Sequence, residues 1–226
     1  VHAIIDDGRV SGQQLLVIAL CFLFNMLDGF DITAMAVVAG AVGTEIAITP
    51  ERLGWIFSFA LAGMMGGAMF LAPVSDIIGR RKTIIVSILV LGVSVLLTAT
   101  ASSLTEFVVL RFLAGLGAGA MLASQATLAD EYSPDRYRAL SVAVVTSGYP
   151  AGAIMTWVAA AAIMPYFGWR GMFWFGGGLT LVMAVIAVLI IPVSLKYLLE
   201  RRPGNALQRI NEILGRLGKE ALDELP

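Results

Sequence analysis

The chain has 226 residues, of which 58% are hydrophobic and only 14% are charged, and its formal net charge is −1. A soluble domain carries about a quarter charged residues, so this composition excludes an ordinary soluble protein and indicates an integral membrane protein. Basic residues do not cluster with aromatic ones, and there is one histidine and one cysteine, so we expect no nucleic-acid partner, metal site or internal disulfide.

Six stretches are mainly apolar and long enough to cross a membrane, since about 20 such residues span the hydrocarbon core, and the first and fourth of them contain charged residues. They cover residues 13–42, 52–75, 83–102, 105–129, 139–165 and 171–194. The sequence therefore predicts an all-α membrane protein with a six-helix transmembrane bundle over residues 1–194. Residues 195–226 are expected to form a cytoplasmic linker, in which apolar residues from Leu207 to Leu217 predict an amphipathic helix.

The basic residues lie mainly on one side of this topology. Twelve of the 15 fall before the first segment, in the links after the second and fourth, or beyond the sixth. Because basic links face the cytoplasm, we expect a multi-pass protein of the cell (inner) membrane, surrounded by lipid bilayer, with both ends of this chain cytoplasmic.

The second and fifth segments end in similar sequences. Gly79 and Gly168 occupy the same offset, and so do Arg81 and Arg170. The match predicts two three-helix repeats, and because three is odd, the copies must have opposite orientations in the membrane. We therefore expect 3+3 inverted repeats.

Three polar residues share one face of the first segment. Asn25, Asp28 and Asp31 are spaced i, i+3, i+6 among Leu, Phe and Met. A carboxylate inside a membrane costs at least a few kcal/mol and commonly marks an ion or proton path. The alternative is a structural role, with each acid hydrogen-bonded to a neighbouring helix. Gly29 between the acids permits close backbone approach.

Arg111 lies near the start of the fourth segment, and Gln125 returns to its face four turns later. Three glycines that favour close helix packing follow it: Gly115, Gly117 and Gly119. We predict that Arg111 is the countercharge of an anionic ligand or of the two aspartates. The alternative is a side chain that snorkels to the outer interface.

The middle of the fifth segment reads Ser147-Gly-Tyr-Pro-Ala-Gly152. Pro150 removes a helical hydrogen bond and bends the helix, either as a packing kink or as a hinge for alternating access. Tyr149, with Asn25 and Gln125, is a candidate for lining a cavity.

The stretch from Ala72 to Lys82 resembles the loop 2–3 signature of the major facilitator superfamily. The matching residues are Asp76, Gly79, Arg80 and Arg81. Ala72 stands where that signature has its leading glycine, and Ile77 stands where it has a basic residue. Arg111 with its three glycines is similar to the span 4 signature of the same superfamily.

Asp28-Gly-Phe-Asp31 resembles the span 1 signature of one subfamily, the aromatic acid:proton symporters. The stretches 110–117, 130–134 and 167–170 also look like that family. The fourth segment, however, reads Met-Leu-Ala-Ser-Gln where the family usually has a Pro-Asn pair. This departure bears on which substrate is bound.

The resemblance implies the N-terminal six-helix half of a symporter that imports small carboxylates, such as hydroxybenzoates, by alternating access. It implies no cofactor beyond the proton gradient and a C-terminal half that is absent from this chain. Asp28 and Asp31 would serve proton coupling and substrate engagement, and Arg111 would meet the carboxylate or balance the acids. The loop 2–3 charges would latch a cytoplasmic gate.

Other functions stay open at this point. A polyol or dicarboxylate symporter would share the fold, and so would a drug antiporter, whose Pro- and Gly-rich span 5 signature Ser147–Gly152 partly fits. A membrane enzyme is disfavoured because the chain lacks paired histidines, a Ser–Lys arrangement and a metal cluster. A non-transporting membrane sensor would bind a ligand without moving it.

Overall fold

The computed structural model describes residues 11–191 together with residues 198, 207, 208, 210, 211 and 215. The cytoplasmic linker and the amphipathic helix expected within 195–226 therefore lie almost entirely outside the described residues. In the described part of the chain, all regular secondary structure is helical.

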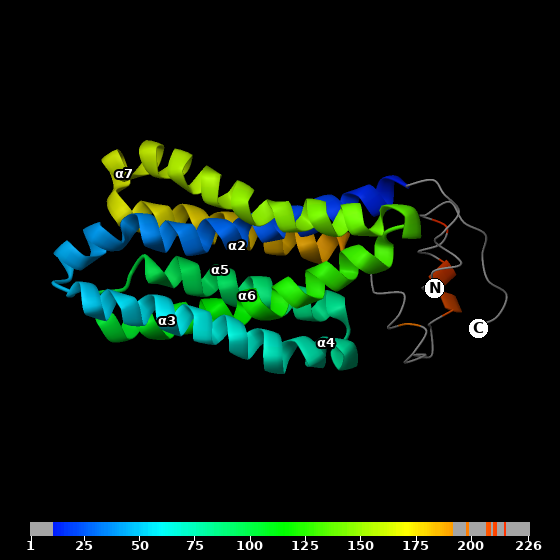
Figure 1. Ribbon diagram of the computed structural model, residues 1–226, viewed down its shortest axis with the longest axis horizontal. Helices are drawn as coiled ribbons and strands as arrows, with labels where there is room; N and C mark the ends of the chain where they lie inside the picture. The colour runs from blue at the N-terminus through cyan, green and yellow to red at the C-terminus, as the bar shows by residue number, and fades with distance from the viewer. Residues whose placement is uncertain (1–10, 192–197, 199–206, 209, 212–214, 216–226) are drawn as a thin grey trace.

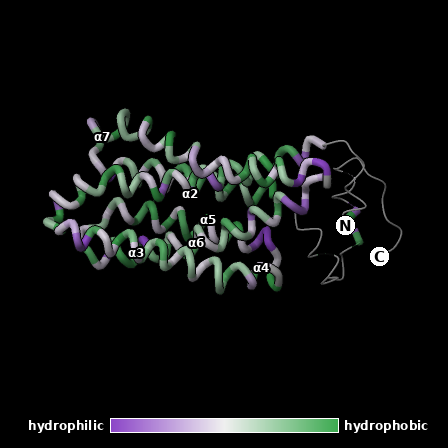
Figure 2. Tube along the Cα trace, viewed as in Figure 1, coloured by the Kyte–Doolittle hydropathy of each residue, from purple (hydrophilic) through white to green (hydrophobic). Residues whose placement is uncertain are grey.

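The helices lie side by side along one long axis (Figure 1). In chain order they are α2 (Gly12–Glu45), α3 (Pro50–Gly66), a π-helical turn (Gly67–Leu71), α4 (Ala72–Ile78), α5 (Arg80–Thr98), α6 (Leu104–Tyr132), a 3-10 turn (Asp135–Tyr137) and α7 (Arg138–Ile190). Hydrophobic residues follow most of the length of the bundle, and hydrophilic ones gather mainly toward its ends (Figure 2). Within the described residues, five helices, counting the run Pro50–Ser75 as one, are long and apolar enough to cross a membrane.

α7 consists of two antiparallel arms joined at Gly168. An uninterrupted helix of its 53 residues would be about 80 Å long, more than twice the thickness of the hydrocarbon core. Gly168 has φ 61° and ψ −166°, a conformation that is essentially restricted to glycine. Figure 1 shows that α7 reverses direction between its two arms. The described residues therefore hold six membrane-crossing segments.

Gly79 makes the corresponding break between α4 and α5. Its φ of 96° is also in the region that glycine adopts without steric cost. Gly79 and Gly168 are the two glycines of the repeated sequence, and each ends one crossing and begins the next.

α3 and α4 form one continuous crossing with a wider turn in its middle. Pro73 has no N–H and so cannot donate to the carbonyl of Met69, four residues earlier. The chain accommodates this loss with the π-helical turn, in which Ala72 donates its N–H to the Gly67 carbonyl, five residues earlier.

Short-range hydrogen bonds define where α2 and α6 begin. Ser11 and Gln14 form a capping box, in which each side chain accepts from the backbone N–H of the other, at 3.3 and 2.8 Å. At α6, the Ser103 hydroxyl accepts from the N–H of Glu106 at 3.3 Å. These bonds satisfy donors that the first turn of a helix would leave free.

Two helix pairs pack at glycines in matching ways. α2 packs chiefly against α7, and α3 packs chiefly against α6. A Cβ at Gly152 of α7 would overlap the Met26 carbonyl of α2, and a Cβ at Gly115 of α6 would overlap the Ala60 carbonyl of α3. The first pair joins crossings 1 and 5, and the second pair joins crossings 2 and 4. If the first three crossings correspond to the last three, crossing 1 matches crossing 4 and crossing 2 matches crossing 5, so the two pairs are equivalent. The helix contacts therefore follow the 3+3 arrangement that the sequence predicts.

Gly63 and Gly54, both in α3, provide a test of this packing. A Cβ at Gly63 would overlap the Phe112 carbonyl of α6, whereas a Cβ at Gly54 meets open space. We expect Gly63→Val to destabilise the protein by about 1–3 kcal/mol or more, since overpacking against backbone forces the helices apart. Gly54→Val should have little effect. Thermal unfolding of the purified whole protein measures the stability of both variants. Equal stability of the two would contradict the packing described.

Candidate functional site

A cavity of about 110 Å³ lies between α2, α3 and α6. Its charged lining consists of Asp28 and Asp31 from α2 and Arg111 from α6. Most of its apolar wall comes from α3: Ile56, Phe57, Ala60, Leu61 and Met64. The structure therefore brings the two acids and the arginine singled out from the sequence to one mainly apolar cavity.

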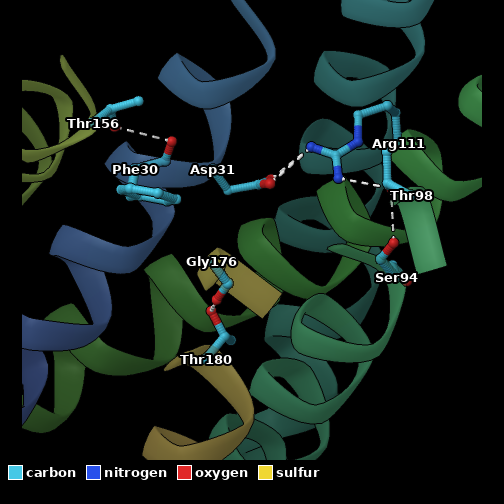
Figure 3. A network of polar contacts seen from close by, with 8 residues as sticks. All are labelled: Phe30, Asp31, Ser94, Thr98, Arg111, Thr156, Gly176 and Thr180. Atoms are coloured by element: carbon cyan, nitrogen blue, oxygen red, sulfur yellow. Dashed lines mark hydrogen bonds and ion pairs between the residues drawn. The ribbon is translucent and has the colours of Figure 1, made fainter. Parts of the chain in front are cut away.

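Arg111 and Asp31 form a buried ion pair between α6 and α2 (Figure 3). Nη1 of Arg111 donates to the two carboxylate oxygens of Asp31 at 2.8 and 3.0 Å. Its Nη2 donates to the Thr98 hydroxyl of α5 at 3.0 Å, and the ring of Phe173 from α7 lies 5.3 Å from Cζ. The arginine is only 2% exposed, so it does not snorkel to the outer interface.

Asp28 lies one turn before Asp31 but has a different environment. It is 1% exposed, and neither of its carboxylate oxygens has a hydrogen-bond partner among the described residues. Burying a charged carboxylate without a partner costs far more than burying a neutral carboxylic acid. The two acids are therefore not equivalent, because only Asp31 has a positive charge to offset its own.

The three residues expected to line a cavity do not line this one. The Asn25 amide donates to the Val145 carbonyl at 2.8 Å and so ties α2 to α7. Gln125 is fully buried, and neither of its side-chain polar atoms has a hydrogen-bond partner in the part of the chain that the structure describes. Tyr149 is about one-third exposed on α7, and its backbone carbonyl faces Gly29.

The basic residues of the loop 2–3 motif join α5 to two other helices. Arg80 is buried and forms an ion pair with Glu131 of α6. Nη2 of Arg81 donates to the Val188 carbonyl of α7 at 2.6 Å. The backbone of Asp76 belongs to α4, but its side chain is outside the described part of the structure. These contacts are separate from the residues that line the cavity.

A second polar cluster lies where α2 ends and the second arm of α7 begins. Glu45 accepts a hydrogen bond from the Trp169 indole at 2.6 Å and forms an ion pair with Arg170. The Trp169 ring packs edge-on against Phe173 with centroids 6.0 Å apart. Since Phe173 also contacts the guanidinium of Arg111, a chain of contacts connects this cluster to the buried ion pair.

Comparison with known proteins identifies the fold. The family described as Major Facilitator Superfamily matches residues 19–218. The chain belongs to the major facilitator superfamily. It is 33% identical to the 4-hydroxybenzoate transporter PcaK of Acinetobacter baylyi over 97% of this chain and 48% of that protein. It is 30% identical to the benzoate transport protein of the same organism, over 93% of this chain and 46% of that protein.

This member of the superfamily spans about half the length of the curated relatives that it matches. A solved structure of the proton:xylose symporter XylE, bound to 6-bromo-6-deoxy-D-glucose, superposes with a TM-score of 0.80 at 20% identity, over 92% of this chain and 50% of that one. At such low identity the likeness concerns the fold alone. The six-helix half of a major facilitator fold predicted from the sequence is confirmed, and the family consists of transporters, not enzymes.

Removing one partner of the buried ion pair should strongly lower the stability of the folded protein. We expect Arg111→Met to destabilise the protein by about 3–5 kcal/mol, because the carboxylate of Asp31 is left buried and unpaired. Adding Asp31→Asn should restore much of this loss. Thermal unfolding of the purified whole protein measures both effects.

Arg170→Met is the matched control, because its ion pair with Glu45 is partly exposed. Such pairs contribute about 0–1 kcal/mol. A cost for Arg111→Met no larger than that for Arg170→Met would contradict the importance of the buried pair.

Proposed function

We propose that this chain is the N-terminal half of a proton-coupled symporter that imports small carboxylates by alternating access, with aromatic acids such as hydroxybenzoates as substrates. The observation that carries the proposal is the meeting of Asp28, Asp31 and Arg111 on an otherwise apolar cavity wall. The relatives named as transporters of 4-hydroxybenzoate, benzoate and gallate support the substrate class.

The cavity has the two surfaces that an aromatic carboxylate needs. A guanidinium binds a carboxylate through paired N–H donors, and Nε of Arg111 has no hydrogen-bond partner among the described residues. Phe57 and Met64 on the α3 wall are suited to pack against an aromatic ring. The acid group of the substrate would therefore face Arg111 and its ring would face α3.

The two aspartates supply the proton coupling in this proposal. Arg111 is occupied by Asp31, so a substrate carboxylate competes with Asp31 for the same guanidinium. A proton on Asp31 removes the charge that holds Arg111 and frees it for the substrate. One proton taken up with one monoanionic substrate leaves the charge of the site unchanged. Asp28, which lacks a partner, is suited to exchange protons with the cavity.

The basic end of the bundle is assigned to the cytoplasmic side of the cell (inner) membrane, with both ends of the chain cytoplasmic. Asp76, Gly79, Arg80 and Arg81 would form a gate element that latches against a second six-helix half. The ion pair of Arg80 with Glu131 of α6 gives this end of the bundle a rigid base for such a latch.

Uptake by cells that express the whole protein tests the function. The panel consists of radiolabelled 4-hydroxybenzoate, benzoate, gallate, succinate, a polyol and xylose, each with and without a protonophore. We expect accumulation of the aromatic acids that the protonophore abolishes. Accumulation of the polyol or of succinate instead would favour another transporter chemistry, and binding without uptake would favour a sensor.

Neutralising either aspartate should uncouple transport from the proton gradient. We expect Asp28→Asn and Asp31→Asn to abolish uphill accumulation of an aromatic acid. Asp28→Asn should still exchange labelled for unlabelled substrate, because Asp28 has no hydrogen bond to Arg111 in the described part of the chain and its loss leaves the carboxylate-binding group in place.

Glu51→Gln is the control, since Glu51 is an exposed acid in the first turn of α3, and it should accumulate substrate normally. If neither aspartate variant alters accumulation or its dependence on pH, the two acids are structural and the coupling role is wrong.

The gate element has a separate test. Asp76→Asn should slow transport while leaving membrane insertion and thermal stability largely intact, because a latch contributes to the conformational change and not to the packing of this half. Initial uptake rates at saturating substrate measure the effect. An unchanged rate would contradict the gate role.

A further inference from the structure

Thr98 is the last residue of α5 and is fully buried beside Arg111. Its hydroxyl donates to the Ser94 carbonyl at 2.8 Å and accepts from Nη2 of Arg111 at 3.0 Å (Figure 3). A threonine hydroxyl has one proton and two acceptor lone pairs. Because the proton is used by Ser94, the side that faces Arg111 can only accept, which is what a guanidinium requires.

Other buried threonines of the bundle lack this second bond. Thr180 donates to the Gly176 carbonyl at 2.8 Å (Figure 3). Thr156 donates to the Gly152 carbonyl at 2.9 Å and to the Phe30 carbonyl of α2 at 3.2 Å, and Figure 3 draws the second of these bonds. Both make the same bond to the carbonyl four residues earlier that Thr98 makes to Ser94. Among the described residues, neither hydroxyl accepts a bond from a side chain. The contact with Arg111 therefore goes beyond the usual way of satisfying a threonine in a helix.

The end of α5 adds an electrostatic reason for this arrangement. The carbonyl end of a helix carries a partial negative charge that stabilises a nearby cation. α5 has no basic residue in its own last turn, and Arg111 of α6 supplies the cation there through its bond to Thr98. Arg111 is thus held by two groups, the carboxylate of Asp31 and the Thr98 hydroxyl at the end of α5.

We propose that Thr98 is a positioning residue, which keeps the guanidinium of Arg111 at the cavity wall when Asp31 is neutralised. The inference rests on the proposed function, in which Asp31 takes up a proton and Arg111 then meets the substrate carboxylate. Nη2 stays on Thr98 while Nη1 changes partner, so the substrate meets a donor that is already in place. Without Thr98, the released guanidinium loses the other hydrogen-bond acceptor that the described residues give it, and part of the binding free energy is spent on ordering it.

Transport kinetics of three variants of the whole protein test the proposal, with 4-hydroxybenzoate as substrate. Thr98→Val keeps the shape but removes the acceptor, and we expect it to raise KM about tenfold, the equivalent of one hydrogen bond to a charged group. Thr98→Ser keeps the hydroxyl and should bring KM back to within about twofold of the unmodified protein. Thr180→Val, the matched loss of a buried hydroxyl, should leave KM unchanged. An unchanged KM in Thr98→Val, or an equal rise in Thr180→Val, would overturn the proposal.

A double-mutant cycle tests the contact without any transport measurement. Lysine has a single compact ammonium and cannot serve Asp31 and Thr98 through separate nitrogens. We therefore expect Thr98→Val to lower the melting temperature of the purified protein clearly in the Arg111 background and much less in the Arg111→Lys background. Equal losses in both backgrounds would refute the contact. If the protein moves no aromatic acid, the proposed function fails, while this cycle still decides whether Thr98 holds Arg111.

Discussion

The ion pair between Asp31 and Arg111 joins the two three-helix repeats inside the bundle. Asp31 lies on α2 of the first repeat and Arg111 on α6 of the second, and Thr98 and Phe173 complete the surroundings of the guanidinium from α5 and α7. Lipid offers no hydrogen-bond partner to a charged group, so each charge depends on the other. Four crossings are thereby held in register around one side chain.

Glycines bring two helix pairs into close contact near this ion pair. Gly152 brings α7 onto α2, and Gly115 brings α6 onto α3, each to a distance that any Cβ would prevent. Backbones in such contact leave no room between them. The cavity lies between α2 and the α3–α6 pair, and Gly115 and Ala60 of that pair are among its lining residues. The close α3–α6 contact therefore forms part of the wall that faces Asp28 and Asp31.

The contacts around Arg111 also reach one end of the bundle. Glu45 at the end of α2 is bonded to Trp169, and Trp169 packs on Phe173, which contacts the guanidinium. Packed aromatic rings transmit small displacements because protein interiors have few voids to absorb them. A continuous series of contacts therefore runs from the buried ion pair to Trp169, next to the turn at Gly168.

The sequence by itself determined the membrane class, the six crossings and their 3+3 organisation, and it singled out Asp28, Asp31 and Arg111 as candidate site residues. These features are readable because a charge in an apolar segment is costly, and because crossing length and glycine placement are local properties of the chain. That Arg111 is a partner of the acids, rather than an interfacial side chain, was one of two alternatives that the sequence left open.

Only the tertiary structure decided which acid Arg111 pairs with, that Asp28 is left without a partner, and that Asn25 bonds to Val145 instead of lining the cavity. Asp31 and Arg111 are 80 residues apart, and their contact depends on the rotation and crossing of two helices, which no local pattern encodes. The sequence pattern did not single out Thr98, because a threonine is a common residue in an apolar helix. The role proposed for it rests on the hydrogen bond that its hydroxyl accepts from a guanidinium of another helix.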